Sequence, residues 1–236
     1  ATVVVSGISY LSYLLKRYVF HESGTLVSGI IGGLYSSTAT ISVLARKSRK
    51  ASEQEATDYV AAMLLAVSMM FLRFMILILI FSREIFLSIY PYLLTMAVVA
   101  AIVAWFIHSR QKRPEDQPAE TEEDDSSNPL EFKVALIFAV LFVIFTFLTH
   151  YTLVYAGTGG LNLLSFVSGF SDITPFILNL LQNTGSVAAL IITACSMQAI
   201  ISNIMVNMFY ALFFAGKGSK LRPWILGGFG VVIACN

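Results

Sequence analysis

Long apolar runs dominate this chain and constrain its fold more than any other feature. A helix needs about 20 apolar residues to cross the hydrocarbon core of a bilayer. Hydrophobic residues make up 57% of the chain and charged residues only 12%. We therefore expect an all-α fold, a polytopic transmembrane helical bundle. The runs predict about eight spans, near residues 1–20, 24–45, 57–82, 86–107, 132–156, 159–181, 186–214 and 221–236.

A polar segment divides these spans into two sets of four. Residues 108–131 hold three prolines and eight of the fourteen acidic residues. Such a composition cannot bury a hydrophobic core, so it predicts a flexible extramembrane linker. The predicted organisation is a first four-helix membrane repeat at 1–107, the acidic linker, and a second four-helix membrane repeat at 132–236.

Two twelve-residue stretches, about 136 positions apart, indicate that the two halves are related. Gly33–Leu44 reads GLYSSTATISVL, and Gly169–Leu180 reads GFSDITPFILNL. Each has a glycine, a hydroxyl or carboxylate three residues later, and a threonine two residues beyond that. Four spans per half is an even number, so both halves should enter the membrane from the same side, which predicts parallel repeats. A re-entrant segment would invalidate this parity argument.

The basic residues between the spans give only a weak orientation signal. With eight single spans, eight Lys or Arg residues fall on one side and six on the other. Cytoplasmic loops carry the excess of Lys and Arg, so the first side, with the linker, is expected to be cytoplasmic. The first side carries Arg46, Lys47, Arg49, Lys50, Arg110, Lys112, Arg113 and Lys133, and the second carries Lys16, Arg17, Arg83, Lys217, Lys220 and Arg222.

Asp172 is the strongest candidate for a functional side chain. Every other acidic residue lies in a loop, the linker or a span end, and an unpaired charge deep in a span costs at least about 2.5–3.5 kcal/mol. Gly169 precedes it and Pro175 follows it by three residues, so we expect a broken helix that exposes backbone groups and helix-end dipoles. The alternative is a carboxylate that only caps an internal break.

Arg73 is the only basic residue well inside a span. A guanidinium there needs a partner, because snorkelling to the surface is difficult from the middle of a span. Asp172 is the only carboxylate expected inside the membrane, so we predict that the two side chains approach each other or flank one polar cavity. The alternative is a purely structural ion pair that joins the two halves.

Hydroxyls and amides occupy the corresponding positions of the two halves. Ser36 stands opposite Asp172, and Ser37 and Thr38 follow it. Spaced hydroxyls can bend a helix or coordinate a dehydrated ion. Asn203 stands opposite the Arg73 region, where an amide can either join two helices or contact a solute.

Two glycines in the first half have a spacing that indicates close helix packing. Gly29 and Gly33 are four residues apart, which places them on one face of a helix. This small-xxx-small spacing favours helix packing over a ligand site. Packing and function are compatible, because close approach would bring the nearby hydroxyls towards the second half.

Motifs of several functional classes are missing from the sequence. There is no HExxH motif, metal-spaced Cys/His set, phosphate-binding loop or catalytic triad, so we expect no enzyme and no cofactor. The chain has no basic patch with interleaved aromatic residues, so nucleic acid is not an expected partner. The expected partners are the lipid bilayer and a small ion or polar solute. A homo-oligomer is compatible with the sequence, and whether a metal binds stays open.

Three segments resemble a known family. Gly7–Leu15, Gly29–Thr40 and Ala45–Lys47 are similar to the C-terminal membrane domain of MgtC/SapB-type bacterial proteins, a domain of unknown function. The similarity continues through Met70–Arg73, Gly169–Asp172 and Asn203. The resemblance implies a multi-pass protein of the bacterial inner membrane with an MgtC-like helical region upstream. The chain begins and ends inside apolar runs, which is the pattern expected of a piece of a longer protein.

These observations predict a transporter or channel for a small ion or polar solute. Asp172 would contact the ion or couple its movement, and Arg73 would be its counter-charge or an anion contact. The alternative is a non-transporting membrane scaffold or regulatory protein that binds a partner through its helices. The predicted site lies at the repeat interface and consists of Ser36, Ser37, Thr38, Arg73, Asp172, Thr174 and Asn203.

Overall fold

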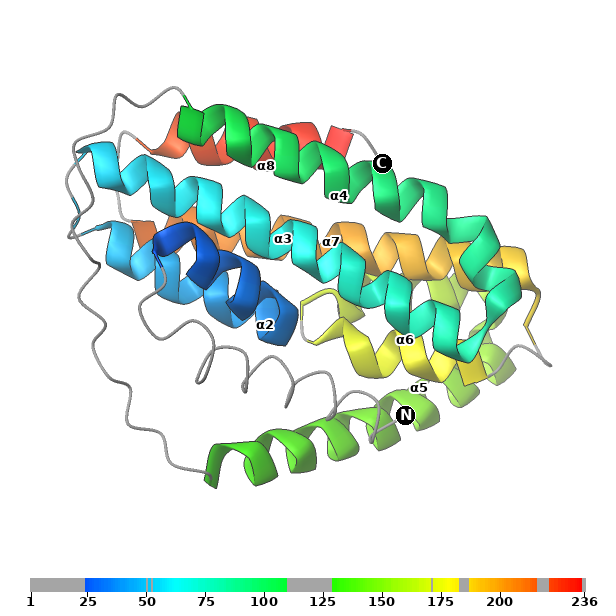
Figure 1. Cartoon of the computed structure of the whole chain (residues 1–236). Helices are drawn as coiled ribbons and strands as arrows, with labels where there is room; N and C mark the ends of the chain where they lie inside the picture. Colours follow the sequence, from blue (N-terminus) through cyan, green and yellow to red (C-terminus); the bar gives the residue numbers. More distant parts are fainter. Residues whose placement is uncertain are drawn as a thin grey trace. The chain divides into compact units, whose positions relative to one another are not determined.

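The computed structural model describes residues 24–49, 51, 53–109, 129–170, 172–182, 187–215 and 221–234. All regular secondary structure in these ranges is helical, which confirms the all-α fold (Figure 1). The predicted first span at 1–20, and the predicted linker between residues 110 and 128, lie outside the described residues. The helices are α2 (Thr25–Ser48), α3 (Glu53–Phe81), α4 (Arg83–Ser109), α5 (Pro129–Ser168), α6 (Ile173–Gln182), α7 (Ala189–Ala215) and α8 (Arg222–Ala234).

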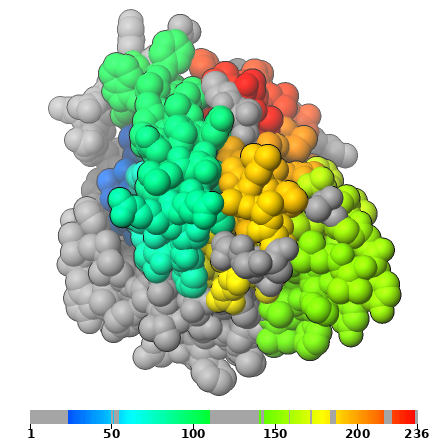
Figure 2. All heavy atoms as spheres, turned by 90° about the vertical axis from the view of Figure 1, so that its right-hand side faces the viewer, coloured from blue at the N-terminus to red at the C-terminus, as the bar shows by residue number. Residues whose placement is uncertain are grey.

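Four segments of the described chain are long and apolar enough to cross a membrane. They lie within α2, α3, α4 and α7, at Thr25–Ser48, Glu55–Phe81, Arg83–Ser109 and Ala189–Ala215. The outer face of α5 also suits a lipid environment, because large apolar side chains along it are exposed, from Val143 and Phe147 to Tyr155 at 81%. Figure 2 shows this helix, in yellow-green, on the surface of the molecule.

Helix α2 is a helical hairpin and not the single span predicted at 24–45. Ser36 has extended backbone angles (φ −156°, ψ 107°) between two helical arms at residues 25–35 and 37–48. A Cβ on Gly32 would lie 2.5 Å from the Oγ1 atom of Thr40. Residues eight apart in a continuous helix are about 12 Å apart along its axis, so the second arm turns back on the first (Figure 1). We call this element the α2 hairpin.

The first arm of the α2 hairpin packs closely against α3. A Cβ on Gly33 would lie 2.5 Å from the Cα atom of Ala66, and a Cβ on Gly29 would meet the backbone of Ala62. Only glycine permits this approach, so the spacing of the two glycines does serve helix packing. Gly33 and its partner Ala66 each lie four residues after Gly29 and its partner Ala62. The first arm therefore runs parallel to α3.

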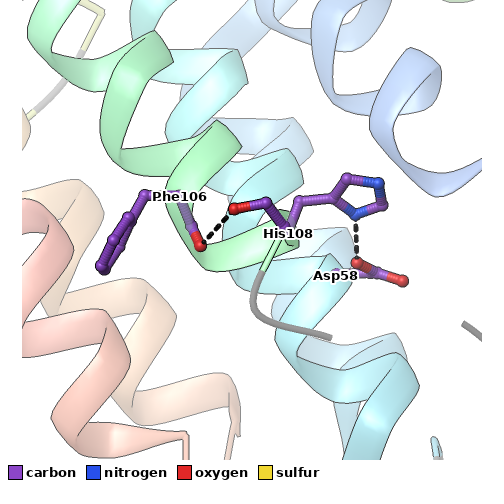
Figure 3. Close-up of polar contacts among 4 residues, drawn as sticks. Asp58, Phe106 and His108 are labelled. Atoms are coloured by element: carbon purple, nitrogen blue, oxygen red, sulfur yellow. Dashed lines mark hydrogen bonds and ion pairs between the residues drawn. The ribbon is translucent and has the colours of Figure 1, made fainter. Parts of the chain in front are cut away.

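Helices α3 and α4 form an antiparallel pair joined by a single residue, Ser82. The Ser68 hydroxyl donates to the carbonyl of Ala97 (2.9 Å), which links the middle of the two helices. Asp58, near the start of α3, accepts a hydrogen bond at 2.7 Å from Nδ1 of His108, in the last turn of α4 (Figure 3). The start of α3 and the end of α4 therefore lie at the same end of this pair.

The segment predicted as one span at 159–181 is two short helices. Helix α5 turns sharply at Gly157, whose angles (φ 59°, ψ −150°) are accessible only to glycine. A Cβ on Gly160 would lie 2.8 Å from Cγ2 of Thr152, so the chain reverses at this turn. The second part of α5 (158–168) ends before Gly169, and α6 begins at Ile173. We call the second part of α5 together with α6 the α5–α6 hairpin (Figure 1).

Helix α6 packs against the first part of α5. The Asn179 amide donates to the Thr146 hydroxyl (2.8 Å), and the rings of Phe145 and Phe176 lie 5.6 Å apart. Residues 173–181 of α6 are all buried, although the helix has only ten residues. A short helix of this kind depends on tertiary packing, because isolated helices of this length are marginal.

The chain forms two compact units, which we describe separately. The Asp172 unit contains α5, α6, α3 from Met75, α4 to Tyr90 and α7 to Asn203. The Arg73 unit contains α2, α8 and the remaining parts of α3, α4 and α7. The division into two sequence repeats at 1–107 and 132–236 stays a prediction.

Candidate functional site

The break in the α2 hairpin is stabilised from its own sequence. Ser36 is the N-cap of the second arm, and its Oγ accepts the backbone N–H of Ala39 at 3.4 Å, a long bond. Serine suits this position because a short hydroxyl reaches the free amides of the first helical turn. The Ser36 side chain is half-buried, and Ser37 is buried. The break therefore lies within the predicted run of hydroxyls.

Arg73 binds a backbone carbonyl at this break. The first arm ends at Tyr35, whose carbonyl has no continuing helix to supply an amide. Nη1 of Arg73, on α3, donates to the Tyr35 oxygen at 2.7 Å. The short distance is typical of a charge-assisted hydrogen bond. Arg73 thus has a partner in the Arg73 unit that the sequence did not indicate.

The break between the two helices of the α5–α6 hairpin lies at residues 169–172. The first helix closes with two short turns, in which the amides of Gly169 and Phe170 donate to the carbonyls of Phe166 (3.2 Å) and Val167 (3.1 Å). Asp172 is then the N-cap of α6, and its Oδ1 accepts the backbone N–H of Thr174 at 2.9 Å. The predicted break beside Asp172 is confirmed.

The local sequence explains why α6 begins beside Asp172. A carboxylate is favourable at a helix N-terminus, where the amides and the helix dipole present positive charge. Pro175 lies in the first turn, in which its missing N–H leaves no donor unsatisfied. Asp172 itself is exposed, whereas Thr174 is fully buried. The carboxylate therefore combines a capping bond with an accessible face.

Asn203 binds a backbone carbonyl at the second break. Its Nδ2 atom donates to the carbonyl of Gly169 at 3.0 Å, and the Ser202 hydroxyl donates to the carbonyl of Phe166 at 2.7 Å. Both residues lie on α7. A Cβ on Gly169 would collide with Ser202 and lie 2.8 Å from the amide nitrogen of Asn203, so only glycine fits at this contact. The amide is thus part of a tight junction between α7 and the hairpin.

The two breaks share a pattern of contacts although they belong to different units. In each, the first arm of a hairpin packs in parallel on the next long helix. The contacting residues are 33 positions apart in both cases, Gly33 with Ala66 and Gly169 with Ser202. Cys195 and Asn162, joined by a 3.4 Å Sγ–Oδ1 contact, have the same separation. The similarity of the two sequence stretches therefore corresponds to a similarity in local structure.

The structure places the predicted site residues in two groups. Ser36, Ser37 and Thr38 lie at the α2 break, where Arg73 binds; Thr38 accepts the hydroxyl of Ser42 through its carbonyl at 2.8 Å. Asp172, Thr174 and Asn203 lie at the α5–α6 break. The predicted approach of Arg73 to Asp172 concerns residues of different units and stays a prediction.

Sequence reasoning missed the groups that the two polar side chains bind. Tyr35 and Gly169 contribute backbone carbonyls, which every residue has and no motif marks. The only available signal was indirect, because Tyr35 directly precedes Ser36 and Gly169 lies three residues before Asp172. Within the described residues, no three His, Cys, Asp or Glu side chains form a group that could hold a metal ion.

Comparisons with known proteins give a family without an assigned function. The chain is 24% identical over 208 residues to an uncharacterized protein of Aquifex aeolicus, and the alignment covers 86% of this chain and 87% of that protein. No solved structure matches the chain. Residues 3–215 match the family described as "Domain of unknown function (DUF4010)". Because this match covers most of its length, the chain belongs to that family.

Proposed function

We propose that this membrane protein transports a small ion or polar solute and that the two hairpin breaks provide the groups that contact it. The observation on which the proposal rests is the pair of helix breaks, each with a polar cap and a polar side chain from the next long helix. Transporters commonly bind substrates and ions at discontinuous helices, where helix ends and backbone groups are available.

The energetics of a membrane support a functional role for these breaks. Non-helical backbone is tolerated at membrane depth only where it is buried in protein or lines a water-filled cavity. The backbone at Gly169 meets the first condition. Gly169 is buried, and its carbonyl accepts a hydrogen bond from Asn203, which is only 4% exposed. Asp172 fits the second condition, since its side chain is exposed despite its place between two apolar helices. An exposed carboxylate in this position suits an ion contact or proton coupling.

The two charged residues suggest separate roles in this proposal. Asp172 offers one free carboxylate oxygen to a cation or proton, while Oδ1 keeps the cap of α6. Arg73 binds the Tyr35 carbonyl through Nη1 at the α2 break, and its guanidinium carries a full positive charge and five N–H groups. It would be a counter-charge or a contact for an anionic solute.

A second candidate is a non-transporting scaffold or regulatory protein. The Asp172–Thr174 bond favours it, because a capping carboxylate needs no transport role to be useful. Under this proposal the charge at residue 172 has no function beyond the cap. The two candidates therefore differ in what happens when the charge is removed and the cap is kept.

Asp172→Asn provides this test, because asparagine caps a helix about as well as aspartate. Purified full-length protein would be reconstituted in vesicles loaded with the pH dye pyranine, and gradients of Na⁺, K⁺, Mg²⁺ or Cl⁻ would be applied. The transporter proposal expects an ion-dependent signal that Asp172→Asn and Arg73→Ala abolish. Asp58→Asn is the matched control, since Asp58 pairs with His108 in the last turn of α4 and caps neither break. If neither Asp172→Asn nor Arg73→Ala changes the flux, the proposal is contradicted.

The cellular setting is a further part of the proposal. The resemblance to MgtC/SapB-type proteins implies the bacterial inner membrane and an MgtC-like helical region upstream. We expect neither an enzyme activity nor a cofactor. Expression of the full-length gene product and fractionation of the membranes would test the localisation.

A further inference from the structure

We infer that the α2 hairpin and the α5–α6 hairpin are both re-entrant and that they open on opposite faces of the membrane. The residues that connect α2 to α3, α4 to α5 and α7 to α8 then lie on the cytoplasmic face. Ser82 and the residues that connect α6 to α7 lie on the outer face. This topology does not depend on the proposed transport activity.

The arms of both hairpins are too short to cross a membrane. The α2 arms comprise residues 25–35 and 37–48, the second part of α5 comprises 158–168, and α6 has 10 residues. At 1.5 Å per residue, each arm is about 15–18 Å long, roughly half of the 30 Å hydrocarbon core. Since each hairpin reverses at its break, it must leave the membrane on the face where it entered.

Three long helical segments lie between the two hairpins along the chain. Helices α3 and α4 and the first part of α5, residues 129–156, are each long enough to cross. Three crossings are an odd number, so the two hairpins open on opposite faces. Helix α7 then crosses back and ends on the face from which the α2 hairpin opens. The inferred topology differs from the one that eight single spans predict, in which the two repeats are parallel.

A contact inside the Arg73 unit brings the ends of α2 and α7 together. The guanidinium carbon of Arg46, near the end of α2, lies 4.4 Å from the centre of the Phe214 ring, near the end of α7. Asp58 and His108 similarly join the start of α3 to the end of α4. These helix ends therefore lie at one end of the unit. Eight single spans would instead place the ends of α2 and α7 on opposite faces of the membrane.

The distribution of basic residues along the chain also favours this topology. Of the fifteen Lys and Arg residues, Lys16 and Arg17 precede the described chain and Arg73 lies inside α3. Eleven of the remaining twelve fall on one face, and Arg83 alone falls on the other, whereas eight single spans divide the same twelve residues eight to four. The positive-inside rule then assigns the first face to the cytoplasm. Its residues are Arg46, Lys47, Arg49, Lys50, Arg110, Lys112, Arg113, Lys133, Lys217, Lys220 and Arg222.

Labelling of single cysteines in the full-length protein tests this topology. The native thiols would be removed, with Cys195→Ala and Cys235→Ser in the region described here, and one serine at a time would be changed in that background. A membrane-impermeant maleimide is expected to label Ser82→Cys and Ser186→Cys from outside intact spheroplasts. Ser52→Cys and Ser219→Cys are expected to be labelled only after permeabilisation.

The competing topology predicts a different pairing of the same four positions. Eight single spans place Ser219 with Ser82 and Ser186 with Ser52, so labelling in those pairs would overturn the inference. A second experiment keeps the native cysteines, so its result does not depend on whether the cysteine variants fold. A protease site inserted between Gly218 and Ser219 should be cut in inside-out vesicles and protected in right-side-out vesicles, and the reverse result would overturn the inference.

Discussion

At the α2 break a guanidinium binds the carbonyl of an exposed residue, whereas at the α5–α6 break a neutral amide binds a buried carbonyl. The caps differ in the opposite sense. Ser36 is neutral and half-buried, and Asp172 is charged and exposed. Each break therefore has one charged side chain and one neutral one. The exposed residue is Tyr35, which accepts from Arg73, at the α2 break and Asp172 itself at the α5–α6 break. The difference teaches that a duplicated backbone geometry can accept opposite charges, provided that water or solute can reach them.

The largest expected effect concerns the close packing of the α2 hairpin. Gly33→Ala should lower the free energy of unfolding by about 2–3 kcal/mol, because its Cβ would meet backbone atoms of Ala66 that cannot rotate away. Thermal unfolding in detergent, followed by intrinsic fluorescence, would measure the loss. Gly227→Ala is the control, since a Cβ there has nothing within 4 Å. Equal stability of the two variants would show that the first arm does not pack on α3 as described.

The next effect compares the two side chains that bind carbonyls. Asn203→Leu should cost about 1–3 kcal/mol, because the buried Gly169 carbonyl loses this donor without access to water. Arg73→Met should cost less, since the Tyr35 carbonyl belongs to an exposed residue, whereas Gly169 is buried. The same unfolding assay would rank them. A larger loss for Arg73→Met would contradict the assignment of the buried and the accessible break.

The cap of α6 gives a smaller effect that separates geometry from charge. Asp172→Ala should cost about 1 kcal/mol, the usual loss for a missing N-cap. Asp172→Asn should retain most of that stability, because the amide oxygen can accept the Thr174 N–H. Denaturation of both variants beside the wild type would measure the difference. If Asp172→Asn is as unstable as Asp172→Ala, the carboxylate charge and not the cap stabilises the break.

The smallest effect would make the first break resemble the second. Ser36→Asp places a carboxylate at the N-terminus of the second arm and should raise stability by about 0.5 kcal/mol, through the helix dipole. Ser36→Ala should lower it by a similar small amount, because the present bond to Ala39 is long. Unfolding midpoints would show both changes. A loss of stability in Ser36→Asp would mean that the first break does not tolerate negative charge.

The sequence contained most of the information on the second break and little on the first. Gly169 and Pro175, on either side of Asp172, predicted a broken helix, and the break is present. The α2 run has no proline, and its break at Ser36 depends on a hydroxyl cap and on contacts with α3. Those contacts are tertiary, so no local pattern indicates that the helix reverses. The glycine spacing nevertheless predicted the close packing correctly.

The site residues show the same limit. A charged side chain in an apolar run is visible in a sequence, so Arg73 and Asp172 were identified as candidates. Their hydrogen-bond partners were not, because the carbonyl of Tyr35 and the amide of Thr174 are backbone groups. Such partners become available only where a helix ends, and the position of helix ends within an apolar run is what the sequence specifies least.

The short arms of the two hairpins have a consequence for synthesis of the protein. An arm of ten to twelve residues is too short to enter the bilayer as a span while it leaves the ribosome. The α2 hairpin is made before α3, yet its glycine face and the Tyr35 carbonyl are both bound by α3. In the inferred topology, the hairpin therefore cannot complete its packing until α3 has been made. Biogenesis of each half then follows an order in which a later helix completes an earlier one.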